Sequence, residues 1–213
     1  MKKYVKSVVT TISEEPYDIK AEVATNPDSS EADLFALADD ENEEIRFKVT
    51  LNPSASAKVL EKLIHDEYDA VIYSAAKHPN VTVDILKELA DSNNEYIRRA
   101  VAKNPSAPIE LLARLAKDSD MNVRLLVALN PSTTPEVLNT LWKDTSLSVR
   151  FALAKNEHMS EDILAALAED PHWMTRTYVA ENPKTPVDVV KSLTKDENRV
   201  VSALATKRLK RLL

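Results

Sequence analysis

Five arginines recur at one position of a repeating pattern, and they are the residues of this sequence best suited to chemistry. They are Arg46, Arg98, Arg124, Arg150 and Arg176, and each follows the one before by 26 residues or by twice that number. A guanidinium group binds carboxylates and phosphates through two parallel hydrogen bonds. A row of such groups therefore indicates either an anion-binding surface or a ladder of internal salt bridges.

Aspartates near these arginines favour the internal ladder. Four of them stand six residues before an arginine of the row: Asp40, Asp118, Asp144 and Asp170. On a helical wheel the arginine lies between two core-facing residues, where a charge requires a partner. We therefore expect buried, paired arginines that tie each repeat to the one before it. For Arg124 the expected partners are Asp118, Asp144 or nearby helix-end carbonyls.

A second ladder is expected at the turn of each repeat. An asparagine stands there, in most cases before a proline: Asn26, Asn52, Asn104, Asn130, Asn156 and Asn182, with His78 in the remaining repeat. A side-chain amide both donates and accepts hydrogen bonds, and Asn-Pro is an ordinary turn former. We interpret this row as structural rather than as a binding site.

The elements that carry both rows repeat every 26 residues without an insertion or deletion. Seven full repeats cover residues 17–198, and each contains two apolar-periodic segments, the second with a leucine pair such as Leu138 and Leu141. A fixed period of this length is typical of solenoids. The sequence predicts an all-α solenoid of seven two-helix repeats without a sheet. We expect one domain, 1–213, in which residues 1–16 and 199–213 are half-repeat caps.

The repeat resembles the variant leucine-rich repeat (LRV) family, whose pattern is VRxxVAxNPxxxPxxLLxxLAxD. The clearest matches are residues 97–118 and 123–144, and the resemblance covers about residues 17–198. It implies an all-helical, right-handed superhelix, similar in style to HEAT and armadillo repeats, in which one segment of each repeat can be a 3₁₀ helix. Some members carry an iron–sulfur module rich in cysteine, and this chain has no cysteine. The resemblance assigns no reaction.

Composition excludes several kinds of site. The chain has no cysteine and no glycine, which removes disulfides, thiolate sites and glycine-rich phosphate loops. Because the chain has no glycine, we expect most residues with positive φ to be Asn or Asp. The histidines, His65, His78, His158 and His172, occupy four different repeat positions and show no metal-ligand spacing. We predict a protein that is not an enzyme and has no metal or cofactor, and keep a catalytic solenoid as a third hypothesis.

Charge and hydropathy limit the classes of partner and the cellular compartment that we expect. The formal net charge of −6 argues against a dedicated nucleic-acid binder. A basic tail, Lys207, Arg208, Lys210 and Arg211, has two interpretations: a last helix covering the open end of the array, or a contact to nucleic acid or an acidic partner. A nucleic-acid-associated α-solenoid is thus the second hypothesis. Neither a signal peptide nor a membrane span is expected, so the cytoplasm is the expected compartment.

The leading hypothesis is a scaffold that binds a protein or peptide along one face. On the first helix of each repeat, three positions opposite the core vary between repeats and are often apolar or aromatic. The candidate partner-binding residues are Phe47, Leu51, Tyr73, Tyr96, Arg99, Leu125, Leu129 and Phe151. Such exposed residues commonly mark interaction sites. Two alternatives remain open: lateral packing between repeats covers these residues, or a homodimer uses them.

Overall fold

A computed structural model describes residues 11–212, and these residues form α-helices without a strand. They fall into two compact units, which divide between Ser106 and Ala107. The predicted all-helical class without a sheet is confirmed for the described residues. The N-terminal half-repeat cap was expected at residues 1–16. Of it, the structure describes a short 3₁₀ helix at Ile12–Glu14, while residues 1–10 lie outside the described residues.

The first unit contains seven α-helices within its described residues. They are α1 (Tyr17–Thr25), α2 (Glu31–Leu37), α3 (Glu43–Leu51), α4 (Ala57–Leu63), α5 (Asp69–Ala76), α6 (Val83–Leu89) and α7 (Glu95–Lys103). The first helix of a repeat has eight or nine residues and the second has seven. Each pair is therefore too short to be stable alone and depends on its neighbours.

The second unit contains eight α-helices within its described residues. They are α8 (Ile109–Leu115), α9 (Met121–Leu129), α10 (Pro135–Leu138), α11 (Leu147–Lys155), α12 (Glu161–Leu167), α13 (Trp173–Glu181), α14 (Val187–Leu193) and α15 (Arg199–Leu212). The predicted last helix is thus α15, and Leu213 lies outside the described residues. Among the helix pairs of residues 17–198 both segments are α-helical, so the 3₁₀ option is not used there.

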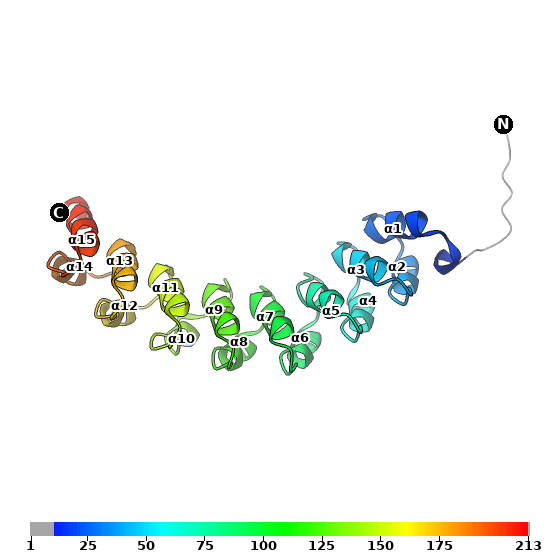
Figure 1. The fold of residues 1–213 in the computed structure, drawn as a ribbon, viewed down its shortest axis with the longest axis horizontal. Coiled ribbons are helices and arrows are strands. Elements are labelled where there is room, and N and C mark those ends of the chain that lie inside the picture. The colour runs from blue at the N-terminus through cyan, green and yellow to red at the C-terminus, as the bar shows by residue number, and fades with distance from the viewer. Residues whose placement is uncertain (1–10, 213) are drawn as a thin grey trace, which may run out of the picture. The chain divides into compact units, whose positions relative to one another are not determined.

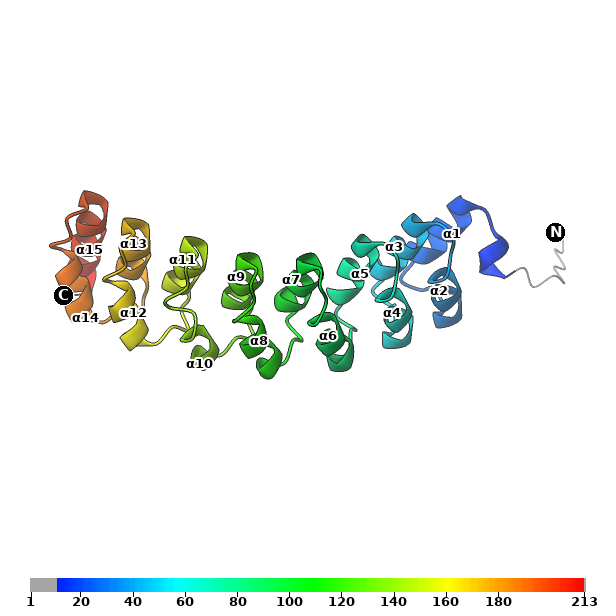
Figure 2. The same ribbon diagram turned by 60° about the horizontal axis from the view of Figure 1, so that its bottom comes forward.

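Within each unit the helices form two rows (Figures 1 and 2). First helices pack side by side, as α1, α3, α5 and α7 do in one unit and α9, α11, α13 and α15 in the other. The second helices form the other row and contact each other less. The first-helix row is consequently the more closely packed side of each unit.

The core lies between the two rows and contains the predicted leucine pairs. Leu34 with Leu37, Leu112 with Leu115 and Leu164 with Leu167 are all buried. Facing them are first-helix pairs four residues apart, such as Val123 and Val127, which are also buried. A fully buried side chain of this size stabilises the fold by about 1.5–3 kcal/mol. The repeated pairs therefore supply most of the apolar stabilisation.

The turns after the first helices need no unusual backbone. No residue in the described part of the chain has positive φ, so the expected left-handed Asn or Asp residues are not found there. Asn52 and Asn104 instead cap their helices in extended backbone, with φ near −74° and −70°. The residue before proline is pushed out of the helical region in this way. The asparagine is required for its side chain rather than for its backbone freedom.

The second helices begin in three different ways. Ser30, Ser56 and Thr82 accept a hydrogen bond from the backbone N–H three residues later. Thr134 and Ser160 stand at the same position but make no such bond. Pro108 and Pro186 are the N-caps of α8 and α14.

Helix α10 is four residues long, whereas the other second helices have seven. Its sequence continues with Asn139 and Thr140, two residues of low helix propensity. The Thr140 hydroxyl donates to the Val137 carbonyl at 2.7 Å, a local bond that competes with helix continuation. Leu141 is still buried, so the core survives the early helix end.

Among the residues that the structure describes, no helix has both the length and the apolar character that a bilayer span requires.

Candidate functional site

The arginines of the first helices bind two loops at once. Arg124 Nε donates to Asp144 Oδ2 at 2.6 Å and Nη2 donates to Oδ1 at 3.0 Å, a bidentate pair. Its Nη1 donates to the Asp118 carbonyl at 2.8 Å. Equivalent Nε bonds to the carboxylate 20 residues later join Arg46 to Asp66, Arg150 to Asp170 and Arg176 to Asp196.

This geometry decides between the expected partners of the arginines. Arg124 binds the expected Asp144 carboxylate and the Asp118 carbonyl. Where an aspartate stands six residues before the arginine, it contributes its carbonyl oxygen rather than its carboxylate, as Asp144 does to Arg150 at 2.7 Å. Its carboxylate is already bound to Arg124 of the same repeat. The second helix returns the chain to the start of the first helix, so the aspartate 20 residues later lies closer in space. Each aspartate also accepts a backbone N–H, as Asp144 does from Ser146 at 2.8 Å.

The arginine row is buried and its charges are balanced. The side chains of Arg46, Arg124, Arg150 and Arg176 are between 9% and 15% exposed. Burial alone would raise the pKa of Asp144, but hydrogen bonds from Arg124 and from the Ser146 N–H hold that pKa below its ordinary value. The hydrogen bond to Asp144 raises the pKa of Arg124. With these donors used inside the chain, the geometry favours a structural ladder over an anion-binding row.

One position of the ladder is altered in both partners. Ile72 stands where other repeats have a basic residue, and Ser92 stands where the matching aspartate would be. In the repeat before the first arginine, Lys20 takes the basic position and bonds Asp40 at 2.8 Å. Arg98 donates to the Ser92 carbonyl at 2.9 Å, and the Asp118 carboxylate accepts the Asp120 N–H at 2.8 Å.

The turn asparagines bind the repeat before their own. The Asn52 amide donates to the carbonyls of Ala24 and Asn26, at 2.9 and 2.8 Å. Asn104 and Asn182 make the equivalent bond to Ala76 and Ala154, each at 2.8 Å. The amide oxygen accepts a backbone N–H two residues on, as Asn130 does from Ser132 at 2.8 Å. These contacts agree with the structural role that we assigned to the asparagines.

Two other residues replace the asparagine and make similar bonds. His78 Nε2 lies 2.9 Å from the Asn52 carbonyl, and its Nδ1 accepts the Asn80 N–H at 3.1 Å. In α15, Arg208 Nη1 donates to the Ala180 carbonyl at 2.9 Å, and its Nη2 donates to the Pro183 carbonyl at 3.1 Å. Arg208 of the predicted basic tail is therefore committed to the preceding repeat, which counts against its use in a phosphate contact.

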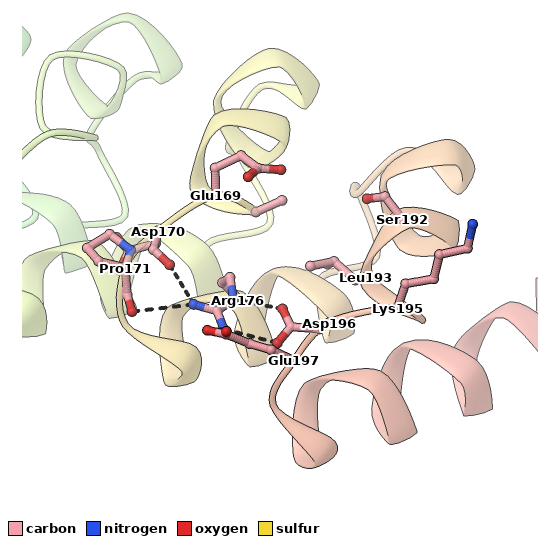
Figure 3. A pocket seen from close by; sticks show the side chains of 10 residues that line it. Glu169, Asp170, Pro171, Arg176, Ser192, Leu193, Lys195, Asp196 and Glu197 are labelled. Carbon is pink, nitrogen blue, oxygen red and sulfur yellow. Dashed lines mark hydrogen bonds and ion pairs between the residues drawn. The ribbon is translucent and has the colours of Figure 1, made fainter.

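Two hollows lie between successive loops of the second unit, beside the arginine ladder. The hollow at Arg176, of about 360 Å³, is bounded by the loops after α12 and α14. In Figure 3 Asp170 and Pro171 flank Arg176 on one side and Asp196 and Glu197 on the other, while Lys195 points away. A hollow of about 520 Å³ at Arg150 is lined by Trp142, Leu167 and Pro171. The guanidinium groups face these hollows with most of their donors already bound.

The candidate partner-binding residues lie on the first-helix row, and their exposure is uneven. Leu51, Tyr96 and Leu129 are 58%, 57% and 59% exposed. Phe47, Tyr73, Arg99, Leu125 and Phe151 are half-buried. The prediction that all of these residues face solvent is therefore wrong for the second group. All of the half-buried members occupy the fifth position of their repeat, which lies beside the next first helix.

Ring contacts explain this partial burial in the second unit. The Phe151 ring meets the rings of His172 and Tyr178 edge to face, with centroids 5.5 and 5.6 Å apart. Tyr178 belongs to the next first helix, α13. Lateral packing thus covers the fifth position in part and leaves the ninth position, with Leu51 and Leu129, open to solvent. The lateral-packing alternative thus holds in part at the fifth position, while use of this row by a homodimer stays a prediction.

Positive charges accompany three aromatic rings of the first-helix rows. Lys77 Nζ lies 5.1 Å from the Tyr73 ring centroid, Arg99 Cζ 4.5 Å from that of Tyr96, and Lys155 Nζ 5.2 Å from that of Tyr178. Contacts of this kind are weak at exposed sites but hold the rings in place. Lys77 and Lys155 share the outer ninth position of the repeat with Leu51 and Leu129, although we did not count them among the candidate partner-binding residues. Tyr178, at the sixth position of its repeat, was not predicted.

The comparisons with known proteins bear on the fold. No protein-family model matches the chain, and no curated protein matches its sequence. Its structure is similar to that of a leucine-rich repeat variant described as having a novel repetitive structural motif. That pair has a TM-score of 0.73 and 23% sequence identity, over 93% of this chain and 78% of the other. The X-ray structure of YibA from Escherichia coli is also similar, with a TM-score of 0.52 and 15% identity, over 98% and 100% of the two chains.

The geometry and the comparisons define the class of protein. The chain is an all-helical repeat protein with the fold of a leucine-rich repeat variant. The resemblance expected from the repeat pattern is confirmed at the level of the fold.

Proposed function

We propose that this chain is a non-catalytic scaffold that binds another protein through the exposed positions of its first-helix rows. The observation that carries the proposal is the exposure of Leu51, Tyr96 and Leu129, which are 57–59% exposed. They lie on helices whose core-facing side chains, such as Val49 and Val127, are buried. Large apolar side chains in such a row support an interaction surface, because Tyr and other large residues are enriched at interfaces.

The pattern of variation between repeats supports the same proposal. Core positions hold similar residues in every repeat, whereas the ninth position holds Leu51, Lys77, Lys103, Leu129 and Lys155 in five successive repeats. Packing requires the core residues to be similar, but it does not require this particular series at an exposed position. A surface that differs from repeat to repeat can distinguish one partner from another.

The test is capture of partners from a native lysate by the chain and by two variants. Leu51→Ser with Tyr96→Ser alters the first unit, and Leu129→Ser alters the second. We expect at least one variant to lose a captured protein while its melting temperature moves by no more than about 2 °C, since exposed substitutions change stability by about 0.5 kcal/mol or less. Phe151 is left unchanged because its ring packs on Tyr178.

A matched control uses exposed apolar residues on the second-helix row. Val83 and Ile109 are 41% and 47% exposed, and we expect Val83→Ser with Ile109→Ser to leave capture intact. Equal loss in both sets of variants would contradict the proposal. If the captured protein is a second copy of this chain, sedimentation of the purified protein will show a dimer that Leu129→Ser or the Leu51 and Tyr96 variant dissociates.

A further inference from the structure

The exposed row of the first unit has a charge opposite to that of the chain. From Phe47 to Lys103, the fifth and ninth positions of the repeats hold six residues, of which three are basic and none is acidic. The chain as a whole has 34 acidic and 28 basic residues. In the first unit the basic members are Lys77, Arg99 and Lys103. A positive strip on an acidic protein points to a partner with negative charge.

Two lysines of this strip have no carboxylate partner. Within the described residues, Lys77 and Lys103 are exposed and form no ion pair. Four other lysines of the same unit each lie within 4 Å of a carboxylate: Lys20, Lys48, Lys62 and Lys87. Among the described lysines of this unit, Lys58 also lacks an ion pair, but it belongs to the second-helix row and lies 4.7 Å from the Phe35 ring centroid. On the first-helix row of this unit's described residues, Lys77 and Lys103 are the lysines without a carboxylate partner.

Helix geometry alone does not account for these lysines. Cations are favourable near a helix C-terminus, and the ninth position is at that end. The same position holds Leu51 in α3 and Leu129 in α9, both more than half exposed, so the helix end does not require a cation. The combination of an exposed leucine with two unpaired lysines is therefore specific to the surface of α3, α5 and α7.

The spacing of the three residues sets the form of the partner. Leu51, Lys77 and Lys103 occupy the ninth position of three successive repeats, whose first helices, α3, α5 and α7, pack side by side. Packed helices lie about 8–10 Å apart. An extended chain rises about 3.3 Å per residue, and a polyproline-like one about 3.1 Å, so every third residue reaches the next helix.

We propose that the surface formed by Leu51, Lys77 and Lys103 binds an extended acidic segment of a partner protein. An apolar side chain of that segment lies on Leu51, and two carboxylates, three and six residues away, lie at Lys77 and Lys103. The Tyr73 ring, whose centroid lies 5.1 Å from Lys77 Nζ, adjoins the second of these contacts. This assignment rests on the proposed scaffold function and specifies the chemistry of its partner.

Synthetic peptides test the assignment. The probe is a fluorescein-labelled ten-residue peptide with Leu, Glu and Glu at positions 2, 5 and 8 in an alanine–serine background, made in both orders. Fluorescence anisotropy at about 0.15 M salt should show one order binding at least tenfold tighter than its Gln counterpart. The same residues at positions 2, 4 and 6 should bind several-fold more weakly. Equal binding of the Glu and Gln peptides, or of the two spacings, would overturn the proposal.

Variants of the chain locate the contact. Lys77→Gln with Lys103→Gln should reduce binding of the Glu peptide about tenfold. Two controls should bind as the parent does: Lys155→Gln, at the ninth position in the other unit, and Lys87→Gln, on the second-helix row. An unchanged affinity of the double variant contradicts the assignment. So does an oligothymidylate probe that binds the parent more tightly than the Glu peptide, because the strip would then be a phosphate-binding surface.

The outcomes separate this inference from the scaffold function. If the Glu peptides fail while Leu51→Ser with Tyr96→Ser still loses a captured protein, the scaffold stands and the acidic segment is wrong. If the peptides bind but no variant changes capture, the surface binds acidic segments and the lysate partners use another part of the chain, which contradicts the scaffold proposal as stated.

Discussion

The repeat at residues 69–94 and the two repeats at residues 121–172 share one backbone pattern but use different side chains to hold it. In the latter, Arg124 and Arg150 bind Asp144 and Asp170 through their Nε atoms at 2.6 Å. In the former, Ile72 and Ser92 occupy both positions, so the charges are absent together. A buried charge without its partner destabilises more than an uncharged pair does. The comparison indicates that the ladder is built from pairs and is not required in every repeat.

The largest expected effect comes from removing one partner where the pair is present. Arg124→Ala should lower the free energy of unfolding by about 3–5 kcal/mol, because Asp144 is left buried and unpaired. Urea denaturation followed by circular dichroism measures this loss. The matched change Ile72→Ala leaves no charge behind and should cost about 1–2 kcal/mol, since Ile72 is half-buried. A loss below about 1 kcal/mol for Arg124→Ala, typical of exposed pairs, would contradict the buried ladder.

A smaller effect is expected from rebuilding the missing pair. Ile72→Arg and Ser92→Asp should each destabilise the chain alone, because each adds a partly buried charge without a partner. Together they should recover about 2 kcal/mol relative to the sum of the single changes. A double-mutant cycle from urea midpoints gives this coupling. Additivity within about 0.5 kcal/mol would mean that the backbone of this repeat no longer brings the two positions together.

The smallest expected effect is a pH dependence specific to His78. Burial lowers the pKa of His78 from its ordinary value of 6.5, although the Asn52 carbonyl opposes the change. As the pH falls, His78 therefore binds a proton in the unfolded chain at a higher pH than in the folded chain. Stability due to His78 is complete above about pH 7, and it declines as the pH falls through 6.5 toward the lower folded pKa.

The control for this prediction is His78→Asn, which restores the residue of the other repeats. The difference in melting temperature between parent and variant should shift in favour of the variant between pH 7.5 and pH 5.5. Subtracting the variant removes the contribution of carboxylates such as Asp66, which titrate in both proteins. A constant difference across this range would show that the pKa of His78 is the same in the folded and unfolded chain.

Much of the fold follows from local sequence pattern. Leu112 with Leu115 and Val123 with Val127 recur at spacings that only a helix brings to one face, and all four are buried. The partner of Arg124 was harder to predict, because Asp118 and Asp144 are both consistent with the sequence. The choice between them depends on how the second helix returns the chain, which is a property of packing.

The exposure of the candidate surface could be predicted only in part for the same reason. A helical wheel separates the core side from the outer side of one helix. Whether Phe151 is covered depends on the neighbouring helix, where Tyr178 and His172 meet its ring. Leu129, at the ninth position of its repeat, stays 59% exposed. The residue types and their spacing were sufficient to predict which residues are buried in the core. Predicting which surface residues are exposed also required the contacts between neighbouring helices.

The hydrogen bonds that the turn asparagines donate run from one repeat to the repeat before it, and this order has a consequence during synthesis of the chain. The amides of Asn52, Asn104 and Asn182 all donate to carbonyls of the repeat before their own. Synthesis at about 5–20 residues per second adds the 26 residues of a repeat in about 1–5 s. During that interval the newest turn on the ribosome has its carbonyls open to water, and each later repeat closes the turn before it.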